Sequence, residues 1–378
     1  MNIALVVGAR PNFVKIAPIF AELRQFPGFS PSLIHTGQHH GAEMSESFFA
    51  ALEIPEPEEN LDVHGGTVTT QTAEVMLRLE PLFASKRPDL VIVVGDVNST
   101  LATALVAVRF GIPIAHVEAG LRSFDRTMPE EINRVLTDQV SDLLFTTEDD
   151  ARANLLREGI SETRVRFVGN VMIDTLKSQL GRAVPIRQTL ARYGTAQGIG
   201  EDVDKYAGLT LHRQSNVDTI DTLKRLVVTI AEISERIPII FPIHPRTRER
   251  LEAFRLMRLI QSSRVALLPP LGYHEMLGLM LTAKFVMTDS GGVQEETTAL
   301  GVPCVTLRSN TERSITVSEG TNTVSGTDPS RIKAVVEDVL TTGGKAGRIP
   351  KLWDGKAAHR ISGILHDWFS VAQRRQVA

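Results

Sequence analysis

The sequence predicts an α/β protein with two domains in series, each built on a parallel β-sheet whose strands are joined by helices. Three observations lead to this prediction. The chain of 378 residues is two to three times as long as an ordinary domain of about 150 residues. Short apolar, β-branched runs alternate with longer amphipathic segments, as buried parallel strands alternate with crossover helices. This alternation stops once, near the middle of the chain, and then starts again.

Five strands are predicted in the first domain, each almost wholly apolar. A strand covered by helices on both faces shows no polar side, so such runs fit the interior of a parallel sheet. The runs are residues 3–7, 90–94, 114–117, 143–146 and 165–168. Between about residues 173 and 207 the alternation pauses, and the polar, glycine-bearing residues 195–202 are predicted to form a surface connection.

The second domain repeats the pattern. Its predicted strands are residues 209–211, 237–243, 265–268, 285–288 and 304–307, with helices over residues 220–236 and 274–283. We expect the two domains to face each other across a central cleft, where α/β proteins commonly bind ligands. A last helix is predicted over residues 356–373, and the pattern alone assigns it to neither domain.

The composition is that of a globular protein without a strong net charge. Hydrophobic residues make up 42% of the chain, and 41 Lys and Arg against 44 Asp and Glu give a net charge of -3. This balance argues against a nucleic-acid partner, and the apolar runs are too short to span a membrane. The single Cys304 fits a reducing compartment. Because the start lacks a basic leader, we expect a cytoplasmic protein.

Candidate functional residues of the first domain follow predicted strands, at the sheet edge where open α/β sheets place their working groups. After the first strand, a turn into a helix brings Arg10 and Lys15 near free backbone N–H groups, which suits a phosphate. Asp96 and Glu118 follow two later strands, and mutual repulsion favours holding one carboxyl protonated for acid–base work. Simpler roles remain open: solvated cations, a helix cap for Asp96, and an ion pair of Glu118 with Arg122.

A third acidic site is Pro129-Glu130-Glu131, which predicts the first turn of a helix. Acids in that turn are stabilised by the helix dipole whether or not they take part in chemistry. Because adjacent helical side chains point about 100° apart, only one of the two acids can face a cleft.

In the second domain, histidine recurs at the ends of two predicted strands. His212, with Arg213 beside it, follows one strand and His244 follows the next. A histidine there can hydrogen-bond or protonate a phosphate, and arginine can pair with it. A single strand-end histidine is more often structural, but the recurrence favours a site.

The sharpest local signal is Ser290-Gly291-Gly292 between a predicted strand and a helix. Small residues there let backbone N–H groups approach an anion, and Glu296, about one turn further on, is placed to accept ribose hydroxyls. Arg313 adds a cation for the same cleft. These residues predict a cradle for a nucleoside diphosphate, and a plain helix cap with two turn glycines is the alternative.

Several familiar sites are missing from the sequence. It contains no GxxxxGK[ST] loop, no HExxH helix and no GxSxG elbow. His39, His40 and His116 are dispersed rather than set at ligand spacing. We therefore expect neither a metal site nor a cofactor.

Taken together, these segments resemble the non-hydrolysing UDP-N-acetylglucosamine 2-epimerases. The matching pieces occur in the family's order between Gly8 and about Asn322, so the ordered set is specific although each piece alone is weak. They are residues 8–11, 36–39, 95–96, 116–122, 129–134, 168–170, 212–213, 289–296 and 311–313.

The resemblance implies a GT-B type fold of two Rossmann-like domains. Residues 1–173 would form the sugar side with the catalytic acids, residues 174–355 would bind UDP, and residues 356–378 would form a helix packing back on the first domain. The implied enzyme is a homodimeric, cytoplasmic isomerase that needs no cofactor and serves surface-polysaccharide precursor synthesis. It would interconvert UDP-N-acetylglucosamine and UDP-N-acetylmannosamine by anti elimination of UDP, through a 2-acetamidoglucal, and re-addition.

The resemblance also assigns roles by position. Asp96, Glu118 and Glu130 match the three catalytic acids, without a decision on which is the base, and His212 matches a histidine that would protonate the departing phosphate oxygen. The implied substrate-binding residues are Arg10, Lys15, Arg122, Arg134, His244, Ser290, Gly291, Gly292, Glu296 and Arg313.

The sequence departs from the family pattern in two respects. Glu74 stands where members activated by their own substrate carry an arginine, and residues 39–43 also differ, so we do not expect activation by substrate. Residues 123–128 are shorter than the common form, lack its aromatic residue beside Pro129, and lie near the expected sugar position. A modified sugar such as a UDP-diacetamido-uronic acid is therefore an alternative substrate, and Arg126 is placed to meet its carboxylate.

Three further alternatives stay open on the sequence. The first is a hydrolysing epimerase that releases free N-acetylmannosamine and UDP. The second is a GT-B glycosyltransferase with an acceptor site, and the third is a nucleotide-sugar binding protein without activity. The three acids favour an enzyme, because binding an anionic ligand does not call for carboxylates beside it.

Overall fold

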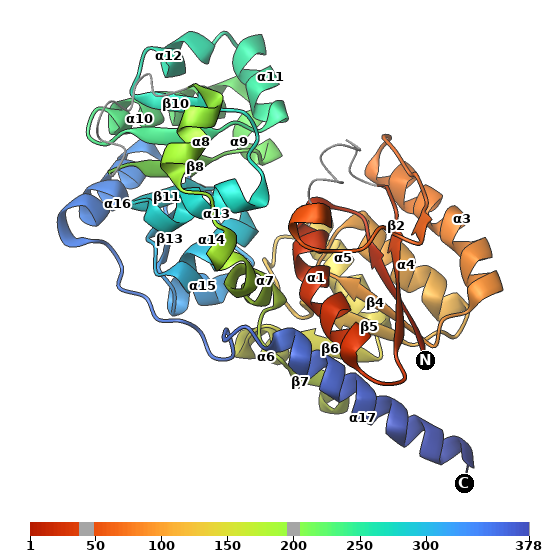
Figure 1. Cartoon of the computed structure of the whole chain (residues 1–378). Coiled ribbons are helices and arrows are strands. Elements are labelled where there is room, and N and C mark those ends of the chain that lie inside the picture. Colours follow the sequence, from red (N-terminus) through yellow and green to blue (C-terminus); the bar gives the residue numbers. More distant parts are fainter. Residues whose placement is uncertain (38–48, 195–204, 378) are drawn as a thin grey trace. The chain divides into compact units, whose positions relative to one another are not determined.

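The structure, a computed structural model, describes residues 1–37, 49–194 and 205–377, with no side chain described for Arg10 or for residues 371–377. The chain forms two compact units, each on its own parallel sheet (Figure 1). Unit 1 is Met1–Ser178 with Lys351–Ala378, and unit 2 is Gln179–Pro350. The prediction of two α/β domains is thereby confirmed. The predicted surface connection, residues 195–202, and the matched residues Gln38 and His39 lie outside the described ranges, as does His40.

Unit 1 contains a seven-stranded sheet in the order β3-β2-β1-β4-β5-β6-β7, with parallel pairing between neighbours. The strands are β1 (Asn2–Val7), β2 (Ser30–His35), β3 (Glu59–Asn60), β4 (Leu90–Val94), β5 (Ile114–Val117), β6 (Leu143–Thr146) and β7 (Val165–Phe167). The five predicted strands are confirmed to within a residue at each end, whereas β2 and β3 were not predicted from the sequence. The strand order reverses between β1 and β4, which makes this the switch point of the sheet.

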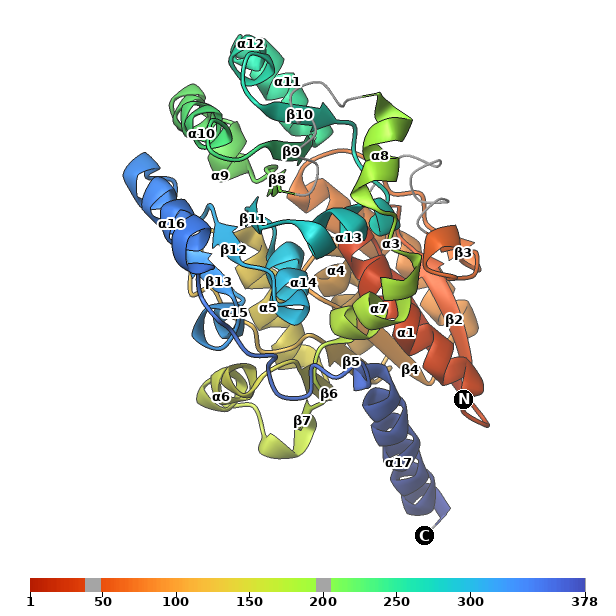
Figure 2. The same cartoon turned by 60° about the vertical axis from the view of Figure 1, so that its left-hand side comes forward.

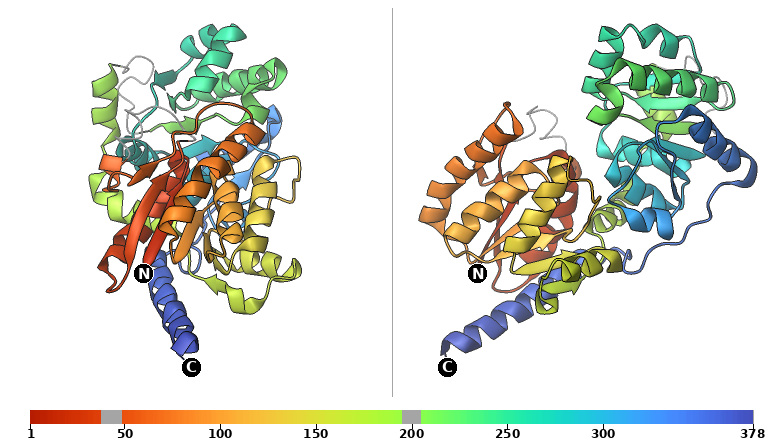
Figure 3. Two further views of the ribbon diagram at one scale, coloured as in Figure 1. Left: turned by 90° about the vertical axis from the view of Figure 1, so that its right-hand side faces the viewer. Right: turned by 180° about the vertical axis from the view of Figure 1, so that it is seen from behind.

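Helices cover both faces of this sheet (Figure 3). They are α1 (Arg10–Gln25), α3 (Val68–Lys86), α4 (Asn98–Arg109), α5 (Pro129–Val140), α6 (Asp149–Arg157), α7 (Val171–Gln179) and α17 (Ala357–Val377). On one face, Val75, Leu79 and Phe83 of α3 join a buried cluster with Val91 and Val93 of β4. The helices α1 and α17 contact each other.

Unit 2 contains a six-stranded parallel sheet in the order β10-β9-β8-β11-β12-β13 (Figure 2). Its strands are β8 (Ala207–Thr210), β9 (Ile239–Pro242), β10 (Val265–Leu268), β11 (Phe285–Thr288), β12 (Cys304–Thr306) and β13 (Asn322–Val324). Its helices are α8 (Ile186–Tyr193), α9 (Gln214–Val217), α10 (Ile220–Ser234), α11 (Pro245–Ala253), α12 (Met257–Gln261), α13 (Tyr273–Thr282), α14 (Gly291–Leu300), α15 (Ser314–Ser318) and α16 (Pro329–Thr342). The switch point lies between β8 and β11.

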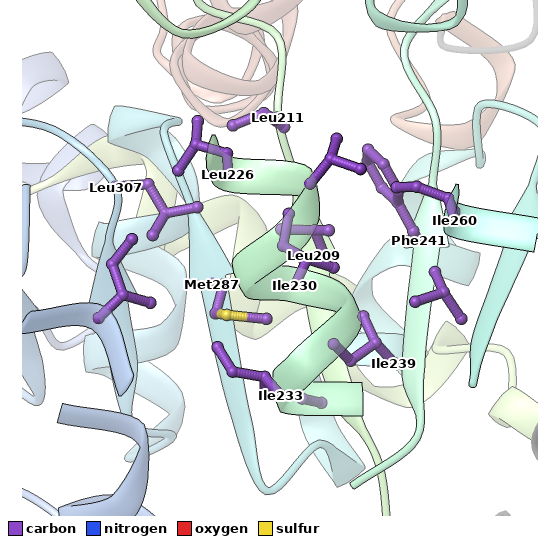
Figure 4. Close-up of a cluster of buried hydrophobic side chains, with 14 of the residues drawn as sticks. Leu209, Leu211, Leu226, Ile230, Ile233, Ile239, Phe241, Ile260, Met287 and Leu307 are labelled. Atoms are coloured by element: carbon purple, nitrogen blue, oxygen red, sulfur yellow. The ribbon is translucent and has the colours of Figure 1, made fainter. Parts of the chain in front are cut away.

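Helix α10 shows how the sequence builds the core of unit 2. Leu226, Ile230 and Ile233 recur at helical spacing and are all buried against Leu209 and Met287 of the central strands (Figure 4). Burying each such side chain stabilises the fold by roughly 1.5–3 kcal/mol. The two predicted helices of this unit, residues 220–236 and 274–283, are confirmed as α10 and α13.

The unit boundaries differ from the expected ones at 173/174 and 355/356. The first crossing lies at Ser178/Gln179, because α7 continues as a helix through the expected boundary. The second lies at Pro350/Lys351, because Trp353 is buried and its Nε1 donates to the Thr147 carbonyl oxygen at 3.3 Å. The tail helix α17 belongs to unit 1. No helix in the described ranges is both long enough and apolar enough to cross a bilayer.

Candidate active site

The start of α1 lies at the switch point of unit 1. The side chain of Asn12 accepts from the Ala9 N–H at 3.1 Å and donates to the Val94 carbonyl oxygen at 3.0 Å, which ties the helix start to the end of β4. The approach is close at Gly8, where a Cβ would lie 2.2 Å from the Ser99 Oγ. The predicted helix start is confirmed, with Pro11 in its first turn. Arg10 is the first residue of α1, and its side chain is outside the described part.

Lys15 and Glu118 form a buried ion pair, with 5% and 3% of their side chains exposed. Lys15 comes from α1 and Glu118 follows β5, so two elements of the same edge meet here. Glu118 has a φ of 73°, a left-handed conformation that is uncommon for a residue with a Cβ. The pair lies against Gly95, whose added Cβ would be 2.9 Å from the Lys15 Nζ. From the sequence, Lys15 was predicted to contact a phosphate, and its partner in the structure is Glu118.

Asp96 is paired with Arg134 of α5 and keeps 24% of its side chain exposed. Its carbonyl oxygen accepts from the Asn133 side chain at 2.9 Å. Helix α4 begins at Asn98 after the N-cap Val97, without a side-chain cap, so the alternative role of Asp96 as a helix cap is wrong. Asp96 and Glu118 thus each pair with their own cation, which offsets the repulsion expected between them.

Glu130 and Glu131 lie in the first turn of α5, as predicted, but differ in what they contact. The Glu131 carboxylate accepts from the backbone N–H groups of Ser123 and Phe124 at 3.0 and 2.9 Å and pairs with Arg134. Burial alone would raise the pKa of Glu131, but these hydrogen bonds and Arg134 lower it. Glu131 therefore holds the loop before α5, while Glu130 is only half-buried.

Arg122 lies in a buried network rather than at an open edge. Its side chain is 1% exposed, and its Nη2 donates to Asp138 at 2.7 Å and to Glu158 at 2.6 Å. The alternative that paired Arg122 with Glu118 is replaced by these partners. Arg134 is likewise buried between Asp96 and Glu131. Both arginines were expected to bind substrate, and both hold acidic side chains of unit 1.

The candidate site of unit 2 contains a His–Asp pair. The Nδ1 of His212, after β8, lies 2.9 Å from Asp289, after β11, and Asp289 is wholly buried. Asp289 also accepts from the backbone N–H groups of His212 and Arg213 at 2.9 Å each. Burial opposes ionisation, but His212 and these N–H groups lower the pKa of Asp289. The carboxylate thus orients the ring, and the Nε2 points away from it, with 37% of the side chain exposed.

Ser290, Gly291 and Gly292 lie where β11 leads into α14. Ser290 is the N-cap, its side chain makes no capping bond, and α14 begins at Gly291. The first backbone N–H groups of a helix have no partner within the helix and attract anions. A Cβ on Gly291 would lie 2.7 Å from the Glu312 Oε1 and 3.4 Å from the Arg313 Nε. Glycine therefore leaves room for the Glu312 and Arg313 side chains at the point where the sequence predicted a diphosphate cradle.

Glu296 is buried in α14 and accepts from the Tyr273 hydroxyl at 3.1 Å. Burial raises the pKa of Glu296 to about 7, with a further rise from Glu295 and an opposing effect from the Tyr273 hydrogen bond. The Tyr273 contact was not predicted. A carboxyl that is half ionised at neutral pH can accept or donate to a hydroxyl.

Arg313 belongs to a buried group of alternating charges. Its Nη1 lies 3.4 Å from Glu295, and Glu312 pairs with Arg308 at 2.8 Å. Arg213 lies 3.8 Å from the same carboxylate. Despite burial, Arg308 and Arg313 hold the pKa of Glu312 well below its usual range. The three arginines and the two carboxylates Glu295 and Glu312 leave one positive charge in excess beside the start of α14.

His244 caps α11 through its Nδ1, which accepts from the Arg246 N–H at 3.2 Å, and its side chain is exposed. Its ring centroid lies 5.6 Å from that of His212, so the structure brings the two predicted histidines together. In the part of the chain that is described, no group of three or more His, Cys, Asp or Glu side chains is arranged to hold a metal ion.

Comparisons with known proteins show the family to which the chain belongs. A family model described as UDP-N-acetylglucosamine 2-epimerase matches residues 21–366. The chain is 42% identical over 368 residues to a UDP-N-acetylglucosamine 2-epimerase of Methanocaldococcus jannaschii, covering 97% of this chain and 99% of that protein. It is also 41% identical over 349 residues to a UDP-2,3-diacetamido-2,3-dideoxy-D-glucuronate 2-epimerase of Pseudomonas aeruginosa, covering 91% and 93%.

Among solved structures, the UDP-GlcNAc 2-epimerase of M. jannaschii in complex with UDP-GlcNAc and UDP matches with a TM-score of 0.89 at 41% identity, covering 97% of this chain and 99% of that one. The fold is therefore of the GT-B type, and the protein is an isomerase. The chain belongs to the UDP-N-acetylglucosamine 2-epimerase family.

The sequence did not predict the side chains that pair with the candidate site residues. Asp289, which pairs with His212, and Asp138, which pairs with Arg122, are two of them. Asp289 begins the matched segment 289–296, directly before Ser290, and its place after a predicted strand was a usable signal. Asp138 gave no comparable signal, because a mid-helix aspartate is ordinarily solvated.

Proposed function

We propose that this protein catalyses the reversible 2-epimerisation of UDP-N-acetylglucosamine and UDP-N-acetylmannosamine. One observation carries the proposal: the same chain has acids on separate elements at the carboxyl edge of one sheet and a His–Asp pair beside a glycine-bearing helix start at the edge of the other. The M. jannaschii relative named for this reaction supports it.

Departure of the diphosphate has to drive the reaction. The C2 proton is a poor acid, because it lies beside neither a carbonyl group nor a metal, so elimination requires a well-stabilised leaving group. In this proposal the N–H groups of Ser290, Gly291 and Gly292 bind the diphosphate with Arg313 and Arg10. His212, held by Asp289 through Nδ1, delivers a proton from Nε2 to the departing oxygen, and His244 contacts the same group.

The two faces of C2 must exchange protons, which calls for acids on different elements. Asp96 follows β4, Glu118 follows β5 and Glu130 opens α5. We assign the removal of the C2 proton and its return to these three groups. Lys15 orients Glu118, and Arg134 orients Asp96. Arg122 holds Asp138, whose carboxylate binds the Gly120 N–H near Glu118. Glu296 accepts the ribose hydroxyls.

The biological setting is part of the proposal. Family membership supports a cytoplasmic homodimer that makes precursors of surface polysaccharides and needs no cofactor. Light scattering of the purified protein tests the homodimer, and a monomeric mass at working concentration would contradict it.

The mechanism is tested by turnover in heavy water. We expect deuterium at C2 of both UDP-sugars, and Asp96→Asn, Glu118→Gln and Glu130→Gln are each expected to suppress exchange while UDP still binds. Asp89→Asn is a matched control, because Asp89 accepts from the Asn2 N–H at the opposite end of the sheet. Full exchange in all three variants would remove the mechanism.

A second candidate substrate is a UDP-diacetamido-uronic acid. The P. aeruginosa relative, 41% identical, is named for such a sugar, and exposed Arg126 lies in the loop before α5. Parallel assays with both UDP-sugars decide between them. Arg126→Ala should lower the turnover of the UDP-diacetamido-uronic acid and leave that of UDP-N-acetylglucosamine unchanged. The same assays detect free N-acetylmannosamine, the product of a hydrolysing epimerase. Transfer of the sugar to an added acceptor would instead indicate a glycosyltransferase.

A further inference from the structure

His116 of β5 is wholly buried, and each of its ring nitrogens faces an acceptor. Its Nδ1 lies 2.6 Å from Asp138 Oδ1, and its Nε2 lies 2.8 Å from the Gly95 carbonyl oxygen. A carbonyl oxygen and an ionised carboxylate only accept, while a neutral imidazole has a single N–H. Both contacts are therefore satisfied only if the ring carries two protons. The geometry thus describes an imidazolium inside unit 1.

The charge of this ring is balanced by Asp138, which is also wholly buried. Burial disfavours ionisation, yet His116 and Arg122 lower the pKa of Asp138. Arg122 bonds both Asp138 and Glu158, at 2.7 and 2.6 Å. His116, Asp138, Arg122 and Glu158 together form a cluster of two cations and two anions, which we call the four-charge cluster.

The four-charge cluster binds backbone groups next to two proposed catalytic acids, Asp96 and Glu118. The Gly95 carbonyl bound by His116 belongs to the residue before Asp96. Gly95 has a φ of 67°, and a Cβ placed on it would lie 3.2 Å from Glu118 Oε2. On the other side, Asp138 Oδ2 accepts from the Gly120 N–H at 3.1 Å, two residues after Glu118. The strand ends of β4 and β5 are thus joined through one ring and one carboxylate.

We propose that His116 is a positioning residue for the epimerisation. Its imidazolium holds the Gly95 turn before Asp96 directly and the Gly120 turn after Glu118 through Asp138, and it keeps a positive charge next to those acids. The inference rests on the proposed function for the reaction that it supports. Charged groups also face this region from α1, from α5 and from the segment before β7. They are Lys15, Glu131, Arg134 and Arg164, whose Nη2 donates to the Asp138 carbonyl oxygen at 3.4 Å.

Two substitutions change the charge of the cluster in opposite directions. His116→Gln removes a cation and leaves a net charge of -1, whereas Asp138→Asn removes an anion and leaves +1. An added negative charge makes a nearby carboxylate hold its proton more tightly, and an added positive charge does the reverse. The acid limb of the pH–rate profile should therefore move up in His116→Gln and down in Asp138→Asn, by roughly one pH unit each.

The experiment measures kcat and C2–H exchange against pH for the wild type and both variants. We expect kcat to fall on the order of 10- to 100-fold, as for other partners that orient reacting groups, together with the opposite shifts. Asp142→Asn is the matched control, since Asp142 accepts from the Ile114 N–H at 2.9 Å, at the other end of the same strand. It loses the same charge and is expected to leave the acid limb in place. Loosened packing alone would not move the limb in opposite directions.

Histidine-selective ¹⁵N NMR of the wild-type protein tests the ring without any substrate. One ring should show two slowly exchanging N–H protons, and the chemical shifts of these protons should change in Asp138→Asn. A ring with one N–H, or identical acid limbs in the variants, overturns the inference even if the wild type epimerises. If His116→Gln does not fold, the acid limb of Asp138→Asn and the NMR signal of the wild type still test whether the charged ring positions the acids. If the wild type shows no exchange at C2, the proposed function is overturned. The NMR signal then still shows whether the His116 ring carries two protons.

Discussion

At the scale of single residues, the structure shows which of two adjacent acids holds the loop before α5. Glu131 is buried among N–H donors and Arg134, whereas the half-buried Glu130 is the one that matches the family. Sequence spacing indicated that the two must point apart but not which way each turns. That choice depends on the loop folding back over Glu131, which is a tertiary contact. The same holds for Arg122, because its partner Asp138 lies 16 residues away.

Glu296 leads to a prediction about stability and pH. Its pKa is raised from 4.5 to about 7, first by burial, so the folded protein holds a proton that the unfolded chain has lost between these values. This contribution is fully present below about pH 4.5 and is lost as pH rises through 7, a change of about 3 kcal/mol. Between pH 5 and pH 8, we therefore expect the free energy of unfolding to fall less in Glu296→Gln than in the wild type.

Urea unfolding of wild type and Glu296→Gln at pH 5 and pH 8 measures this difference. Asp174, whose pKa is raised to about 6 by burial, contributes a slope of the same sign and remains in both proteins. Glu249→Gln, at an exposed position of α11, serves as the control. Equal slopes in wild type and Glu296→Gln would contradict the prediction.

At the scale of elements, hydrophobic pattern predicted the strands that are buried on both faces. It failed for β2, β3 and β13, and each failure has a physical reason. The first three residues of β2 are not buried, β3 has only two residues, and β13 begins with the buried Asn322. Asn322 is satisfied there by Thr306 and Gln294 at 2.6 and 3.0 Å. Such polar satisfaction exists only in the folded sheet and leaves no periodic signal.

Helix α17 is attached to unit 1 through a carboxylate at its start. Asp174 of α7 accepts from the N–H groups of Ala357 and Ala358 at 3.1 and 2.7 Å. Asp174→Ala leaves two helix-start donors unpaired, so we expect the helix to lose about 1 kcal/mol of local stability. Hydrogen exchange of peptides from residues 357–370 should rise by roughly five- to tenfold.

The matched control for this prediction lies in unit 2. Asp328 caps α16 by accepting from the Arg331 N–H at 2.9 Å. Asp328→Ala should loosen α16 and leave α17 unchanged, while Asp174→Ala does the reverse. Unchanged exchange in α17 on substitution of Asp174 would show that apolar packing alone anchors the helix.

At the scale of the whole molecule, the path of the chain makes unit 2 continuous and unit 1 discontinuous. The chain contains two tryptophans, and both, Trp353 and Trp368, lie in the returning segment of unit 1. Tryptophan fluorescence therefore reports the unfolding of unit 1 alone. Because the two units have separate cores, we expect them to unfold in separate steps rather than with a single midpoint.

This separation allows a test of where UDP binds. If the cradle at α14 holds the diphosphate, UDP at 100 times its Kd stabilises unit 2 by about 2.7 kcal/mol. Hydrogen exchange of β8 and α14 should slow accordingly, while the tryptophan transition shifts much less, because Arg10 is the one residue of unit 1 that we propose to contact UDP. UDP-N-acetylglucosamine, whose sugar also engages the acids, should move the tryptophan transition further. Equal shifts with UDP alone would contradict the assignment of UDP mainly to unit 2.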